Sequence, residues 1–173
     1  MKRLVHTSFI ILLLIPQVAL CLETEARLKT AFIYQFTKYI DWPTDSLADS
    51  FHITLVGSSA LASPLNDLAQ EKKIKDRQVS IHIVQSTEEI PPSQIIILSG
   101  QNEGMLDAIL ARIQSRPTLT ITESHGFASR GAILNFYLTP EGKLRFEANR
   151  KAAEKQKLIL SSQLLKMARL VGE

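Results

Sequence analysis

The chain contains little cysteine and glycine and few aromatic residues, and these shortages exclude several classes of protein. The single cysteine among 173 residues, Cys21, excludes an internal disulfide, a four-cysteine zinc site and an iron–sulfur cluster. Seven glycines and seven prolines are too few for a collagen-like or low-complexity chain. Because 45% of the residues are hydrophobic, the chain is also too apolar to remain disordered, and we expect one globular domain.

The sequence also lacks the common catalytic motifs. It contains no Gly-x-Ser-x-Gly, Walker, His-Glu-x-x-His or Gly-x-Gly-x-x-Gly pattern. Residues 57–59, Gly-Ser-Ser, are the nearest approach to an anion-binding loop, but they lack a lysine and further glycines, so we interpret them as an ordinary turn. The histidines of the mature chain are dispersed: His52, His82 and His125. We therefore predict no enzymatic activity, no metal site and no cofactor.

The N-terminal segment is typical of a secretory signal peptide. Lys2 and Arg3 give it a positive start, and residues 9–15 form an uncharged apolar run that is too short to span a bilayer. We predict a signal peptide over residues 1–21 and a single mature domain over residues 22–173. Removal of the signal peptide lowers the formal net charge from +3 to +1, so we expect no nucleic-acid partner.

Cys21 allows a second interpretation of the same segment. Residues 18–21, Val-Ala-Leu-Cys, resemble a bacterial lipobox, in which Cys21 would be lipidated and become the N-terminus. The bulky Leu20 argues against this alternative. With simple cleavage after Cys21, the mature protein has no cysteine and no membrane insertion, and core packing alone must stabilise it in an oxidising compartment.

The hydrophobic pattern predicts alternating helices and strands. We expect helices over residues 24–41, 61–72, 102–114 and 150–173, and strands over residues 51–56, 79–84, 94–98, 118–122, 132–138 and 143–148. Strands separated by helices imply crossover connections, whereas the turn at residues 140–142 adds an antiparallel hairpin. We therefore predict an α/β fold: a single three-layer domain with a mixed, mostly parallel sheet flanked by helices.

Two segments carry longer motifs. The first is AFIYQFTKYIDWP at residues 31–43, and the second contains LRFEAN at residues 144–149 and LILSSQLL at residues 158–165. Together they resemble the YfiR family of periplasmic regulatory proteins, which combines an Ala-Phe-x-Tyr-x-Phe-x-Lys-aromatic-x-x-Trp-Pro helix with later Arg-Phe-x-x-Asn and Leu-x-x-Ser-Ser-x-Leu-Leu motifs. The resemblance spans nearly the whole mature chain.

The resemblance implies a regulatory role rather than a catalytic one. We expect a periplasmic protein of a Gram-negative bacterium that binds the periplasmic domain of an inner-membrane diguanylate cyclase and represses it, which lowers cyclic-di-GMP. A homodimer would match the symmetry of a dimeric cyclase. Two alternatives remain open: a periplasmic small-ligand sensor module that reports to a sensor kinase or transporter, and a hydrolase that uses Ser58 or a histidine.

The motifs also name candidate partner-binding residues, which are Lys38, Trp42 and Arg145. Lys38 and Arg145 lie in otherwise apolar motifs, so we expect each to form a structural ion pair or to contact a partner. Trp42 is at the same time expected to dock the first helix on the sheet, together with Phe32 and Phe36.

The chain departs from the family pattern at one position that matters for regulation. The family often has a Cys-His pair just before the third strand, where this chain has Ser93 and Gln94. Control by thiol redox chemistry is therefore not expected. Asn149, which follows the last strand, is a good helix N-cap and explains the final residue of the Arg-Phe-x-x-Asn motif without a ligand.

Overall fold

The computed structural model describes residues 16–44, 49–100, 103–114 and 116–172. Residues 1–15 of the expected signal peptide lie outside this part of the chain. Helix α1 (Pro16–Tyr39) begins with the last residues of that expected segment, earlier than the periodic pattern indicates. Proline suits the first turn of a helix, because an N–H group there would have no intrahelical partner and its absence costs no hydrogen bond.

The other helices and strands alternate along the chain. The helices are α2 (Ala62–Glu71), η2 (Thr87–Glu89, 3-10), α3 (Glu103–Arg112), α4 (Arg150–Lys155) and α5 (Ser162–Met167). The strands are β1 (Ile40–Asp41), β2 (Ser50–Val56), β3 (Lys73–Ile74), β4 (Arg77–Val84), β5 (Ile95–Leu98), β6 (Leu119–Thr122), β7 (Leu134–Leu138), β8 (Leu144–Ala148), β9 (Ile159–Leu160) and β10 (Arg169–Leu170). Each of the six expected strands is present, with its ends within two residues of the prediction.

The main sheet has eight strands in the order β10-β8-β7-β6-β5-β2-β4-β3. Its neighbours are parallel except for the β7–β8 hairpin and the β3–β4 pair, which are antiparallel. Strands β1 and β9 form a separate antiparallel pair. The predicted α/β fold with a mixed, mostly parallel sheet is therefore confirmed.

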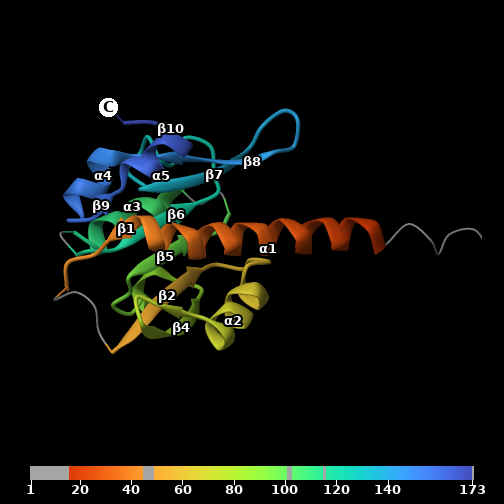
Figure 1. Cartoon of the computed structure of the whole chain (residues 1–173), viewed down its shortest axis with the longest axis horizontal. Coiled ribbons are helices and arrows are strands. Elements are labelled where there is room, and N and C mark those ends of the chain that lie inside the picture. The colour runs from red at the N-terminus through yellow and green to blue at the C-terminus, as the bar shows by residue number, and fades with distance from the viewer. Residues whose placement is uncertain (1–15, 45–48, 101–102, 115, 173) are drawn as a thin grey trace, which may run out of the picture.

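Helices cover both faces of this sheet. On β2, Phe51, Ile53 and Leu55 belong to the core shared with α1 and α2, whereas Val56 belongs to the core beneath α3. Figure 1 shows α1 lying across the strands as the longest element of the domain. Strand β5 is buried along its whole length, as expected of a strand covered from both sides.

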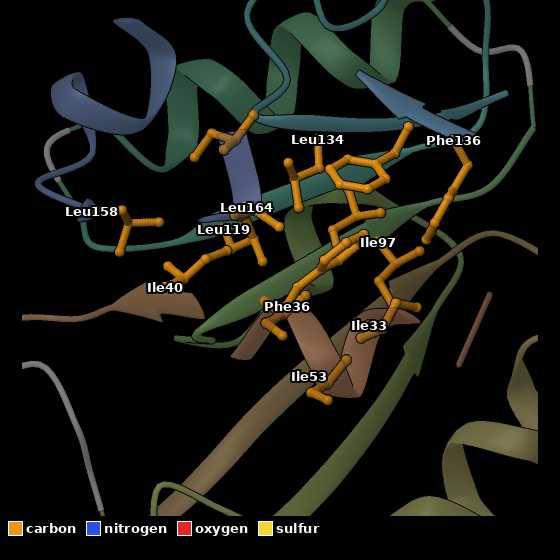
Figure 2. Packing of buried hydrophobic residues seen from close by; sticks show 14 of the residues in the cluster. Ile33, Phe36, Ile40, Ile53, Ile97, Leu119, Leu134, Phe136, Leu158 and Leu164 are labelled. Atoms are coloured by element: carbon orange, nitrogen blue, oxygen red, sulfur yellow. The ribbon is translucent and has the colours of Figure 1, made fainter. Parts of the chain in front are cut away.

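Aromatic side chains of α1 form the centre of the larger core. The Phe36 ring lies 5.7 Å from the ring of Phe136 and 4.8 Å from that of Phe146. The ring centroid of Phe32 lies 5.9 Å from that of Phe36, and Figure 2 shows Phe36 among the other buried side chains of this core. Such pairs add about 0.5–1.5 kcal/mol each beyond the burial of their area. The prediction that these aromatics dock α1 on the sheet is confirmed.

The C-terminal segment differs from the single long helix that we expected. It consists of α4, β9, α5 and β10, so the prediction of one helix from Arg150 onwards is wrong. Lys157 adopts a positive φ of 59° after α4. Burial then alternates from Leu158 through Ile159 to Leu160, which is the period of a strand. The Ser161 side chain accepts a hydrogen bond from the Leu164 N–H and begins α5 as its N-cap.

Asn149 confirms the cap that we predicted for α4. Its side-chain oxygen accepts from the Ala152 N–H at 2.9 Å, and its amide nitrogen donates to the Ala128 carbonyl at 2.7 Å. Asn149 is buried, so these bonds also connect α4 to the loop after β6. Across the part of the chain that the structure describes, no helix combines the length and the apolar character that a membrane span requires.

Candidate functional site

A groove of about 350 Å³ lies at the carboxyl edge of the parallel strands. Its walls come from α1, the loop that follows β6, and the β7–β8 hairpin, which extends beyond the end of β6. Carboxylates, cations and aromatic rings meet there: Glu25, Lys29, Glu123, His125, Phe136, Tyr137, Glu147 and Arg169. In α/β proteins with parallel strands, ligands commonly bind outside this edge of the sheet.

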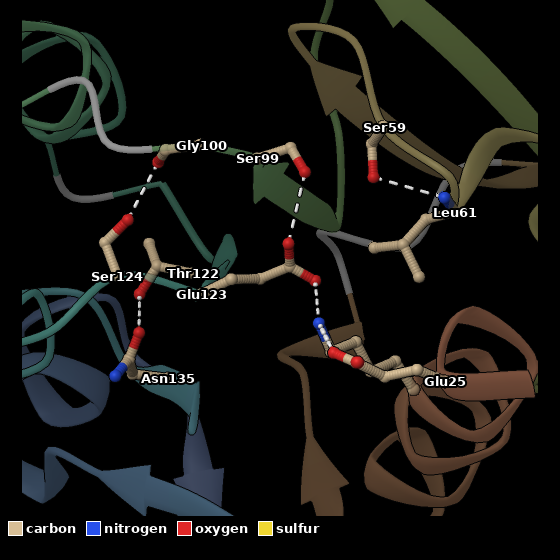
Figure 3. Close-up of polar contacts among 10 residues, drawn as sticks. Glu25, Ser59, Leu61, Ser99, Gly100, Thr122, Glu123, Ser124 and Asn135 are labelled. Atoms are coloured by element: carbon tan, nitrogen blue, oxygen red, sulfur yellow. Dashed lines mark hydrogen bonds and ion pairs between the residues drawn. The ribbon is translucent and has the colours of Figure 1, made fainter. Parts of the chain in front are cut away.

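Lys29 connects the helix wall of the groove to the sheet. Its ammonium lies 2.7 Å from the Glu25 carboxylate, one turn earlier in α1, and 3.0 Å from the carboxylate of Glu123, which follows β6. Ser99, which follows β5, donates to the other Glu123 oxygen at 3.2 Å (Figure 3). Burial alone would lower the pKa of Lys29, but the hydrogen bonds and charges of the two glutamates outweigh it and raise the pKa.

Glu147 is the buried carboxylate of the opposite wall. It accepts hydrogen bonds from the Arg169 guanidinium and, at 2.8 Å, from the Asn135 amide, while Thr122 donates to Asn135 at 2.7 Å. The Arg169 guanidinium also lies 4.2 Å from the Tyr137 ring centroid. This polar chain crosses β6, β7, β8 and β10 and fixes the charged side chains of the groove in one arrangement.

The residues predicted from the sequence motifs are not among those that line this groove. Lys38 is exposed at the end of α1, with its ammonium 4.7 Å from the Tyr34 ring centroid. Arg145 is exposed on β8, and its guanidinium donates to the neighbouring carbonyl of Leu144 at 3.2 Å. Both side chains are therefore accessible to a partner.

Trp42 is buried, with 7% of its surface exposed. Its ring packs edge-on against Phe51 at 5.4 Å, and its indole N–H donates to the Gln94 carbonyl at 3.3 Å. These contacts agree with the expectation that Trp42 docks the end of the first helix on the sheet.

The Gly-Ser-Ser segment at residues 57–59 forms a turn, as interpreted from the sequence. The Gly57 N–H donates to the Val84 carbonyl at 2.9 Å, and Gly57 has a φ of +89°, which glycine adopts most readily. The Ser59 hydroxyl accepts from the Leu61 N–H at 3.1 Å. These groups are engaged within the turn and its neighbouring strand.

The structure brings two histidines together that seemed unrelated in the sequence. His52 Nδ1 on β2 lies 3.0 Å from His82 Nε2 on β4. Desolvation by burial and the charge of His82 lower the pKa of His52. Both residues lie on the same face of neighbouring strands, so strand alternation combined with the parallel register would have found them. In the described residues, no group of three or more His, Cys, Asp or Glu side chains is placed to hold a metal ion.

Fold and groove together define a one-domain α/β protein with a groove of charged and aromatic side chains outside the carboxyl ends of its parallel strands. A family model, DUF4154 (YfiR/HmsC-like), matches residues 26–169. The chain therefore belongs to the YfiR/HmsC-like family, which confirms the resemblance seen in the two motifs. At the level of the family this supports a periplasmic regulator of diguanylate cyclase signalling, in a group of regulators that are not known enzymes.

Solved structures share the fold at low sequence identity. One is the ABC domain in complex with L-Trp from Streptococcus pneumonia, with a TM-score of 0.54 and 13% identity. Another is a conserved domain protein from Vibrio cholerae O1 biovar El Tor, with a TM-score of 0.53 and 15% identity. In each comparison 84% of this chain is covered, and the chain spans 60% of the other. No curated protein matches the chain.

Proposed function

We propose that this chain binds the periplasmic domain of an inner-membrane diguanylate cyclase and represses it. The family match over residues 26–169 carries this proposal. Repression requires that the chain bind the inactive state of the cyclase more tightly than the active state, because only differential affinity shifts that equilibrium. Cyclic-di-GMP synthesis on the cytoplasmic side then remains low while the complex persists.

This role requires that the chain first be exported to the periplasm. The signal peptide over residues 1–21 would be removed after Cys21, so that the mature chain begins at Leu22, within α1. Intact-mass measurement of the protein recovered from the periplasm tests this step. A mass that corresponds to a start at Leu22 supports it, whereas a lipid-modified Cys21 would support the lipoprotein alternative.

Lys38 and Arg145 are the proposed partner contacts. Both are exposed cations, so they suit an acidic surface on the cyclase domain and would contribute mainly to the rate and specificity of association. Trp42 would act indirectly, because its buried ring positions the end of α1 rather than offering its own surface.

Deletion of the gene tests repression directly. The proposal predicts a rise in cellular cyclic-di-GMP that a plasmid copy of the wild-type gene reverses. An unchanged level in a strain that normally expresses the protein would refute repression. Co-purification with the isolated periplasmic domain of the cyclase then separates direct binding from an indirect effect.

The groove favours a second candidate function, a small-ligand sensor module that reports to a sensor kinase or transporter. Its volume of about 350 Å³ and its mixture of cations, carboxylates and aromatic rings suit a ligand of amino-acid size. The Streptococcus structure with the same fold was solved with L-Trp. Calorimetric titration with L-tryptophan, with glycine as the control, tests this candidate, and a kinase rather than a cyclase encoded beside the gene would favour it.

A further inference from the structure

His52 and His82 are not among the residues that line the groove. His52 pairs with Ser80 across the strands, and His82 pairs with Thr54, so the two imidazoles meet on a diagonal of one sheet face. Their ring centroids are 5.2 Å apart, and the two nearest nitrogens are 3.0 Å apart. The nitrogens therefore point toward each other along the line that joins the rings.

The surroundings hold the backbone of the pair but leave the rings half-buried. The His52 N–H donates to the side-chain oxygen of Gln94 at 2.7 Å, which anchors β2 at this residue. The neighbouring Thr54 hydroxyl is hydrogen-bonded to Ser93, so it does not compete for the imidazoles. Both histidines thus remain partly exposed to solvent, and their nearest ring nitrogens are hydrogen-bonded to each other.

We propose that His52 and His82 bind one late first-row divalent metal ion, with Cu²⁺ bound more tightly than Ni²⁺ or Zn²⁺. Imidazole nitrogen is a preferred ligand for these metals, and the Irving–Williams order places Cu²⁺ first. An ion midway between the two nitrogens needs them about 4 Å apart at usual metal–nitrogen distances. Metal binding would therefore replace the hydrogen bond between the two nitrogens, and rotation about χ would have to separate them by about 1 Å or turn both toward an ion beside the line.

Water would fill the remaining coordination positions of the metal ion. The described residues place no third histidine, cysteine or carboxylate with the pair, so the site is open and binds more weakly than a closed four-ligand structural site. A bound ion would join β2 to β4 through their side chains, in addition to the backbone hydrogen bonds of the sheet.

Titration of the purified untagged protein with Cu²⁺ tests the proposal, with calorimetry for affinity and electron paramagnetic resonance for the ligands. We expect one equivalent of Cu²⁺ with two nitrogen ligands. His52→Gln and His82→Gln should each weaken binding at least tenfold and change the nitrogen signature. His125→Gln is the matched control, because His125 is exposed in the loop after β6, and it should bind as the wild type does.

Retained binding in the double variant H52Q/H82Q, or an equal loss in H125Q, would overturn the assignment. Circular dichroism verifies that each variant is folded. A measurement on the wild type alone covers the case in which a variant fails to fold: substoichiometric Cu²⁺ should broaden the imidazole NMR signals of His52 and His82 first. Broadening that begins at His125 or at the N-terminus instead would also refute the site.

Discussion

Lys29 of α1 and Glu123 at the end of β6 form an ion pair, with 3.0 Å between the ammonium nitrogen and the carboxylate oxygen. Only 14% of the Lys29 side chain and 19% of the Glu123 side chain are exposed. Water therefore screens this pair less than it screens the surface pairs of the same helix. The pair connects the middle of α1 to the carboxyl edge of the sheet and defines one wall of the groove.

Substitution Lys29→Met should lower the free energy of unfolding by about 2–3 kcal/mol, because two partly buried carboxylates lose their cation. Arg27→Met is the control in the same helix. Arg27 pairs with Glu23, but 58% of each side chain is exposed, so its loss should cost about 0.5 kcal/mol or less. Urea denaturation of the three proteins measures the difference. Equal losses for the two variants would contradict the role given to Lys29.

Lys29 should also make the stability depend on alkaline pH. Desolvation lowers its pKa, but Glu25 and Glu123 more than compensate, so the pKa lies above the ordinary value of 10.5. The folded chain then retains a proton that the unfolded chain has released, and the stabilisation present below 10.5 is lost as the pH rises through the raised pKa. The difference in unfolding free energy between wild type and Lys29→Met should therefore shrink above pH 10.5. A difference that stays constant there would refute this linkage.

Asn149 should stabilise the C-terminal segment through both ends of its amide. Asn149→Ala should cost about 2 kcal/mol, because it removes the cap of α4 and the shorter of two hydrogen bonds to the Ala128 carbonyl, which then keeps only the Gly131 N–H. Asn149→Ser keeps an oxygen for the cap but cannot reach Ala128, so an intermediate loss is expected. Thermal unfolding of the three proteins gives the comparison, and a serine variant as unstable as the alanine variant would show that the cap contributes little.

Charge reversal at Lys38 or Arg145 should affect binding without affecting the fold. Each exposed side chain can be changed to glutamate with a stability change within about 0.5 kcal/mol. Affinity for the periplasmic domain of the cyclase should fall about three- to tenfold, mainly through slower association at low salt. Lys151→Glu, at an exposed position of α4, is the control. Unchanged association rates for both K38E and R145E would remove these residues from the interface.

The strands were predictable because their local pattern and their burial agree. The run Ile95–Leu98 is apolar on both faces, and the structure buries all four residues. The aromatic spacing of α1 likewise matched the core around Phe36. The C-terminal segment was not predicted correctly, because the spacings of Leu160 to Leu164 and of Leu158 to Leu165 suit a helix as well as the observed strand and short helix. The Ser161 cap was the local signal that distinguished the two.

Neither the groove nor the histidine pair could be read from the sequence in the same way. Lys29 and Glu123 meet only because α1 crosses the end of β6, which is a tertiary relationship. The distance between His52 and His82 depends on the parallel register of β2 and β4, and hydrophobic alternation alone does not determine this register.

Gln94 holds three segments that are far apart in the sequence. Its carbonyl accepts the indole N–H of Trp42 and the backbone N–H of Leu119, while its side-chain oxygen accepts the N–H of His52. A displacement of Trp42 must therefore act on the first residues of β2, β5 and β6 at the same time. The segment that follows α1 and the amino edge of the sheet are therefore coupled through one residue, so Gln94 links the position of the helix end to the alignment of three strands.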